Sequence, residues 1–113
     1  MEIVKERFED AGEKDEEGYY DYYYAGFYFH FKEGKEVFVV RQYEDIPEEA
    51  SFLQYSVKGE RNLEQQHLEV IPYENPLFCM AVSHLIEKES IRYIKILLKG
   101  YITVDIKKAT KTS

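Results

Sequence analysis

Cysteine is nearly absent from this sequence of 113 residues, with Cys79 as its single occurrence. One cysteine cannot form an internal disulfide, which favours a reducing compartment. Long hydrophobic runs are missing too, since no segment approaches the roughly 18 apolar residues of a membrane-spanning helix. The first ten residues, MEIVKERFED, lack the apolar stretch of a signal peptide. These absences predict a soluble, cytoplasmic protein without a membrane partner.

The sequence also lacks the common motifs of catalysis and metal binding. It has no phosphate-binding glycine motif, CxxC pair, HExxH helix or nucleophile elbow. The histidines His30, His67 and His84 are scattered, without the spacing of metal ligands. Cys79 and His84 lie about 140° apart on a helical wheel, so their side chains diverge, and Cys79 sits in the apolar run LFCMAV. We therefore expect no metal and no cofactor, and the sequence leans away from an enzyme.

Positive charge is the scarcer sign, and the formal net charge is −7. Each contact to a nucleic-acid phosphate requires lysine or arginine, so the sequence argues against a nucleic-acid partner. Residues 1–22 hold nine acidic residues against three basic ones, whereas residues 88–113 hold seven basic residues against two acidic ones. This asymmetry is typical of two solvated faces, or of an acidic end that meets a basic partner.

Aromatic residues, in contrast, are abundant and concentrated. The stretch EGYYDYYYAGFYFHFKEGKEVFVV, residues 17–40, holds six of the eleven tyrosines and four of the seven phenylalanines. From residue 24 onward the order has a period of two, which indicates a strand. The phenylalanines share one face with Ala25. The other face carries a polar and amphipathic set: Tyr24, Gly26, Tyr28, His30 and Lys32.

The segment KEG after this strand predicts a three-residue hairpin loop closed by a left-handed glycine. Phe31 would then lie opposite Lys35, and His30 opposite Glu36. The second face of the hairpin would carry an apolar cluster of Tyr24, Tyr28, Phe38 and Val40. A two-residue loop would swap the faces of the second strand, but it would place Glu33 at positive φ, which is unfavourable.

Other elements follow from local signals. Residues 2–8 read as a strand, and residues 9–18 as an exposed acidic loop. Residues 45–60 show both helical spacing and strand alternation; we favour a helical turn at 47–50 followed by a strand at 51–58. Residues 67–73 read as a further strand, stopped near Pro72.

The segment ENPLFCMAVSHLIEKES predicts the main helix, at about 75–89, with Asn75 as the N-cap and Pro76 at its first position. Its apolar stripe comprises Phe78, Ala81, Val82, Leu85 and Ile86. Near the C-terminus, the loop LKG would pair Leu97 with Tyr101 and Ile96 with Ile102, although one long bent strand is an alternative. Residues 108–113 read as a frayed polar tail.

These elements predict a single domain, residues 1–113, of the α+β class: a mostly antiparallel sheet of five to seven strands packed on one main helix. A helix of about fourteen residues is about 21 Å long and covers one face of such a sheet. The tyrosine side then needs another cover. The acidic loop, a curled sheet or a second protein chain would each provide one.

We expect a small acidic protein-interaction module that binds a protein partner, with an inhibitor or immunity-type protein acting on a basic partner as one form. The alternatives are a homodimer, or a small-ligand-binding or enzymatic domain with a pocket between helix and sheet near His84, Tyr55 or Tyr93. The candidate partner-binding residues are Glu16, Glu17, Tyr20, Asp21, Tyr22, Tyr24, Tyr28, His30 and Phe38.

Overall fold

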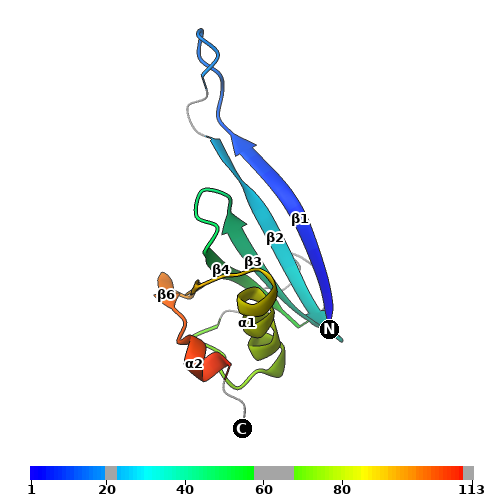
Figure 1. Cartoon of the computed structure of the whole chain (residues 1–113). Coiled ribbons are helices and arrows are strands. Elements are labelled where there is room, and N and C mark those ends of the chain that lie inside the picture. The colour runs from blue at the N-terminus through cyan, green and yellow to red at the C-terminus, as the bar shows by residue number, and fades with distance from the viewer. Residues whose placement is uncertain (20–22, 58–67, 111–113) are drawn as a thin grey trace.

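A computed structural model describes residues 1–19, 23–57 and 68–110 and shows the expected α+β fold, with a mostly antiparallel sheet and a helix packed on it (Figure 1). The described strands are β1 (Glu2–Ala11), β2 (Tyr23–Glu33), β3 (Glu36–Tyr43), β4 (Glu49–Ser56), β5 (Tyr93–Leu97) and β6 (Tyr101–Thr103). The helices are α1 (Pro76–Lys88) and the short α2 (Ile106–Ala109). The strands form one sheet in sequence order. Neighbours are antiparallel except β4 and β5, which are parallel and are joined by a connection containing α1.

The helix α1 begins where the sequence predicts. The Asn75 side-chain oxygen accepts hydrogen bonds from the backbone N–H groups of Leu77 and Phe78, and Pro76 occupies the first turn. Four of the five residues predicted for the apolar stripe are buried: Phe78, Ala81, Val82 and Leu85. The fifth, Ile86, is half-buried, and Leu77 is buried in addition.

The core lies between α1 and one face of the sheet. Phe78 of α1 packs on Phe38 and Phe52, with ring centroids 5.8 and 4.8 Å away. At the β1 edge, Lys5 extends over the ring of Phe27 and pairs with Glu89 at the end of α1, at 3.2 Å. The other strand residues of this core are Phe29, Phe31, Val40, Ala50, Ile94 and Ile96.

The β2–β3 hairpin has a different register from the predicted one. Phe31 lies opposite Phe38, and Glu33 opposite Glu36, so the loop has two residues, Gly34 and Lys35. Gly34 takes the positive φ of 58°, so Glu33 does not need it. The two-residue alternative considered from the sequence placed Glu33 in the loop, whereas the observed loop begins one residue later, at Gly34. The prediction that Phe38 faces away from the core was therefore wrong.

The second hairpin has the predicted register. Leu97 pairs with Tyr101 and Ile96 with Ile102 across the β5–β6 turn, so the chain reverses instead of continuing as one bent strand. Here the loop length and the isoleucine pattern agree, and that agreement makes a register readable from sequence.

Four local assignments differ from expectation. β1 continues to Ala11, so the first residues of the expected 9–18 loop are strand, and residues 12–18 form the exposed connection. Residues 47–48 are turn and β4 already begins at Glu49, without a helical turn. The described part of the expected 67–73 strand, residues 68–73, is not a strand, and α2 takes up the first residues of the expected polar tail.

The molecule is elongated, with principal extents of 57 × 30 × 27 Å. The long β1–β2 hairpin projects beyond the helices, with residues 12–19 at its tip (Figure 1). Asp15 shapes that tip, because its carboxylate accepts hydrogen bonds from the N–H groups of Glu17 and Tyr19. Among the described residues, neither helix has the length and apolar character to cross a membrane.

Candidate functional site

The side of the sheet that faces away from α1 carries exposed aromatic side chains. Strand pairing places them on a common side, since directly opposed residues share a face: Arg41 lies opposite Tyr28 and Ser51, and Ser51 lies opposite Lys95. Alternation along each strand then assigns the remaining members. We call this surface the tyrosine face, defined by Tyr24, Tyr28, Tyr43, Tyr93 and Tyr101.

An aromatic cluster forms one half of the tyrosine face, on β1, β2 and β3. The ring centroid of Phe8 lies 4.5 Å from that of Tyr28 and 6.0 Å from that of Tyr43. Tyr24 lies 5.7 Å from Tyr43 and is 47% exposed. The rings support one another at distances typical of aromatic pairs, so a large part of this surface is held in a fixed geometry while still in contact with water.

The other half of the tyrosine face lies on β5 and β6. Tyr93 is 59% exposed and Tyr101 is 50% exposed, and Leu97, which pairs with Tyr101, is exposed as well. Ile46 in the β3–β4 connection is a further exposed apolar side chain. Exposed aromatic and aliphatic groups thus occur on β2, on the β3–β4 connection and on β5–β6. Exposed apolar patches often mark interaction surfaces.

Between these halves lies a hollow of about 210 Å³, lined by Arg41, Tyr43, Ile46, Glu49, Ser51, Lys95 and Tyr101. The Arg41 guanidinium stacks on the Tyr43 ring, 4.6 Å from its centroid, and donates a hydrogen bond to the Tyr101 hydroxyl at 2.9 Å. Lys95 pairs with Glu49 at 2.8 Å. The hollow therefore joins the two halves of the tyrosine face.

The same side of the sheet is buried at the end near the β2–β3 turn. His30, Val37 and Val39 are each at most 6% exposed. Since these values refer to a single chain, this end is covered without a partner. The accessible end of the tyrosine face is therefore the one towards the projecting hairpin, and Tyr93 and Tyr101 add accessible surface on β5 and β6.

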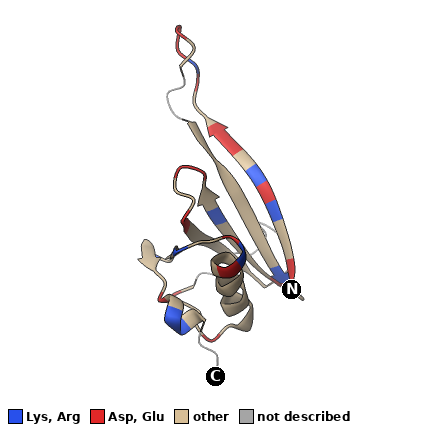
Figure 2. Ribbon diagram, viewed as in Figure 1, with Lys and Arg blue, Asp and Glu red and all other residues tan. Residues whose placement is uncertain are grey.

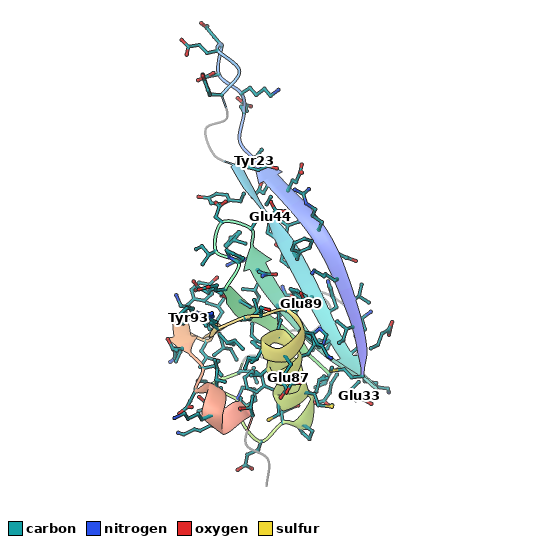
Figure 3. The ribbon with its side chains drawn as sticks, in the orientation of Figure 1. Tyr23, Glu33, Glu44, Glu87, Glu89 and Tyr93 are labelled. Carbon is teal, nitrogen blue, oxygen red and sulfur yellow. The ribbon has the colours of Figure 1, made fainter. Side chains whose placement is uncertain are left out.

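Acidic side chains border this accessible end. Asp10 lies directly opposite Tyr24, and Glu44, Asp45 and Glu48 occupy the β3–β4 connection. Figure 2 shows acidic residues on the projecting hairpin and the β3–β4 connection, whereas α2 carries lysines. In Figure 3, Tyr23 and Glu44 lie towards the projecting end, whereas Glu87 lies on α1 and Glu89 at its C-terminal end.

The residues predicted as partner-binding have different outcomes. Tyr24 is exposed on the tyrosine face, while Tyr28 is half-buried against Phe8. Phe38 was predicted wrongly, because it is 1% exposed in the core under α1. Glu16 and Glu17 are exposed at the tip of the projecting hairpin, whereas Tyr20, Asp21 and Tyr22 lie outside the described residues.

His30 also requires a correction. It is buried, it lies opposite Val39 instead of Glu36, and its Nε2 atom is 3.8 Å from a carboxylate oxygen of Glu6. The pairing with Glu36 assumed the three-residue loop, so it fails with that register. A buried side chain cannot contact a docking partner directly, which removes His30 from the accessible surface.

The nucleophile and metal-ligand candidates do not assemble into a site in the described part of the chain. Burial raises the pKa of the Cys79 thiol, whose Sγ atom contacts the Tyr73 carbonyl oxygen at 3.1 Å. His84 packs edge-on against Phe31, with ring centroids 5.7 Å apart. Among residues 1–19, 23–57 and 68–110, no three His, Cys, Asp or Glu side chains are grouped so that they could hold a metal ion.

Comparisons with protein-family models, curated protein sequences and solved structures find no match to this chain. Sequence reasoning missed Arg41, Tyr43, Tyr93 and Tyr101 as members of the same surface. For Tyr93 and Tyr101 a signal was available: Tyr93, Lys95 and Leu97 are spaced two residues apart and so share one face of β5, and Leu97 pairs with Tyr101. Joining them to Arg41 requires the parallel β4–β5 pairing, which no local pattern reveals.

Proposed function

We propose that this chain is a small protein-interaction module that docks a basic protein partner through the tyrosine face. The supporting observation is the exposure of Tyr24, Tyr93 and Tyr101, at 47–59%, on the side of the sheet away from α1. Tyrosine combines a large rigid apolar area with a hydroxyl group, so it is stable in water and gains free energy when a partner excludes that water. An inhibitor or immunity-type protein that blocks a basic toxin or nuclease is one concrete form.

The charge distribution supports a basic partner. Asp10, Asp45 and Glu48 border the accessible end of the tyrosine face, and the projecting hairpin adds Glu16 and Glu17. A partner rich in lysine and arginine would approach this end with favourable long-range electrostatics, which raise the association rate more than the final affinity.

A homodimer is a weaker alternative for the same surface. Pairing two copies through a two-fold contact at the tyrosine face would bring two sets of acidic residues together. With a net charge of −7 on each copy, the long-range interaction between them is repulsive. A basic heterologous partner meets the same aromatic area without this cost.

Site-specific photo-crosslinking tests the proposal. A benzophenone amino acid replaces Tyr24 or Tyr93 in cells that express the protein, and Met80, exposed on α1, provides the control position. We expect the same basic protein to be crosslinked from both tyrosine positions and not from Met80.

The captured protein is then produced pure, and its affinity for the wild type is compared with that for a Tyr24→Ala/Tyr93→Ala variant. We expect a loss of about tenfold or more for the double variant, against little change for Met80→Ala. Equal crosslinking from all three positions, an acidic captured protein, or a second copy of this chain as the crosslinked species would contradict the proposal.

A further inference from the structure

The floor of the hollow on the tyrosine face is a row of polar side chains that crosses three strands. Arg41 on β3 lies opposite Ser51 on β4, and Ser51 lies opposite Lys95 on β5. Ser51 is short and only 8% exposed, whereas its neighbours on either side are long cationic side chains. The depression therefore arises from a small residue set between two basic ones, which is a geometry suited to an anion.

Arg41 is the group in this row that is prepared for a negatively charged ligand. The Tyr43 ring and the Tyr101 hydroxyl hold the Arg41 guanidinium in place. The hydrogen bond to Tyr101 uses one of the five N–H groups of the guanidinium. The nearby carboxylates pair elsewhere, Glu49 with Lys95 and Glu44 with Arg7. Within the described part of the chain, Arg41 consequently has no carboxylate at ion-pair distance.

The local charge of the hollow favours an anion despite the acidic character of the whole chain. Two cationic groups, Arg41 and Lys95, face one carboxylate, Glu49, which leaves one net positive charge among the lining residues. The acidic residues of the projecting hairpin and of the β3–β4 connection are not among the lining residues; of the latter, Glu44 pairs with Arg7 and Glu48 with Arg92. Salt at physiological strength screens exposed charges beyond about 8 Å.

The walls of the hollow are apolar. The apolar lining comprises Tyr43 at the end of β3, Ile46 in the β3–β4 connection and the ring of Tyr101 on β6. A volume of about 210 Å³ is below the usual 300–1,000 Å³ of sites for drug-sized ligands, so a single small apolar group fits better than an extended molecule.

We propose that this hollow binds a carboxylate attached to a small apolar body, with the carboxylate on Arg41 and the body between Tyr43, Ile46 and Tyr101. An arginine held in place by stacking offers two parallel N–H groups to a carboxylate, a pairing stronger than an ordinary hydrogen bond. The site does not depend on docking of a protein partner, since its groups are complete within one chain.

Benzoate is the test ligand, because it has one carboxylate on one ring, and uncharged benzamide is its control. Nuclear magnetic resonance titrations at about 0.15 M salt follow the backbone amides. We expect benzoate to shift the resonances of Arg41, Ser51 and Lys95 with an affinity in roughly the millimolar range, and benzamide to bind several-fold more weakly.

Variants then assign the carboxylate to its partner. Arg41→Gln should weaken benzoate binding about tenfold or more, and Arg41→Lys, which keeps the charge but not the paired N–H groups, should give an intermediate loss. Arg92→Gln removes the same charge from an exposed position outside the hollow and should leave benzoate binding unchanged.

A further titration separates two sources of the same chemistry. N-acetyl-phenylalanine resembles the C-terminus of a polypeptide. Tighter binding than benzoate indicates a terminal carboxylate, and weaker binding indicates a free small acid.

Equal binding of benzoate and benzamide, unchanged affinity in Arg41→Gln, or shifts centred on α2 would overturn the proposal. If Arg41→Gln fails to fold, the comparison of benzoate with benzamide on the wild type still decides. Crosslinking at Tyr24 is independent of these results, so failure of one proposal leaves the other standing.

Discussion

Gly26 lies where β2 passes too close to β3 for any side chain. A Cβ atom added there would lie 2.0 Å from the carbonyl oxygen of Gln42, which belongs to the neighbouring backbone and cannot move aside. We expect Gly26→Ala to lower the free energy of unfolding by about 2–3 kcal/mol or more, measured by urea denaturation.

Gly100 in the β5–β6 turn provides the matched control. A Cβ atom there would meet nothing within 4 Å, and the residue does not need positive φ. Gly100→Ala should leave the free energy of unfolding within about 0.5 kcal/mol of the wild type. Similar losses at both glycines would show that close approach at Gly26 is not the cause.

Tyr55 is a titratable residue whose ionisation should affect stability. Burial, with a hydrogen bond to Glu36 at 2.8 Å, raises the pKa of Tyr55 from its usual value of about 10 to about 12. The folded state therefore holds the phenolic proton more tightly than the unfolded state does. The resulting stabilisation is fully present below about pH 10 and is lost as the pH rises towards about 12.

Comparing wild type with Tyr55→Phe isolates this effect from the ionisation of other tyrosines and lysines. We expect the difference in their free energies of unfolding to decrease between about pH 10 and pH 12, measured by urea denaturation at each pH. A difference that stays constant across this interval would contradict the raised pKa of Tyr55.

At the scale of elements, α1 is fixed to the sheet through its N-terminus. Besides capping α1, Asn75 donates a hydrogen bond from its side-chain amide to Glu36 at 3.0 Å, at the start of β3. We expect Asn75→Ala to cost about 1–2 kcal/mol of the free energy of unfolding. Asn75→Ser keeps a capping oxygen but loses the link to Glu36, so its loss should be smaller. Equal losses in thermal or urea denaturation would show that the cap contributes little.

Elements with strong local signals were predictable, and elements without them were not. The cap and stripe of α1 were predicted because Asn75, Pro76 and the apolar spacing all agree. The faces of β3 were not, because Val37, Phe38, Val39 and Val40 are all apolar and, in the structure, all buried. Such a run has no alternation, so its orientation depends on the loop, where one residue decides the side of every following side chain.

At the scale of the whole molecule, the candidate site was predictable only in part. The two-residue period of β2 correctly placed Tyr24 and Tyr28 on the face of the strand that does not carry the phenylalanines. The hollow, however, combines side chains from β3, β4, β5 and β6, and its position follows from the parallel pairing of β4 with β5. Long-range pairing of this kind depends on the three-dimensional path of the chain, so sequence patterns within single strands did not reveal it.

The charge asymmetry of the whole molecule leads to a kinetic prediction for the proposed partner complex. Asp10 and Asp45 border the tyrosine face and have no ion-pair partner among the described residues. Asp10→Asn/Asp45→Asn should slow association several-fold at low salt and leave dissociation nearly unchanged, because long-range attraction acts before contact. Tyr24→Ala/Tyr93→Ala should instead speed dissociation, because the aromatic contacts form only in the bound state.

The matched control is Glu74→Gln/Glu87→Gln, which changes the net charge by the same amount; Glu74 directly precedes the N-cap of α1, and Glu87 lies on α1 (Figure 3). Surface plasmon resonance with the captured partner, at salt concentrations from about 0.02 to 0.5 M, measures both rate constants. The difference in association rate between the two pairs of variants should disappear at high salt, where the charges are screened. If both pairs slow association equally, the partner responds to the total charge of the chain, and the acidic residues beside the tyrosine face have no directing role.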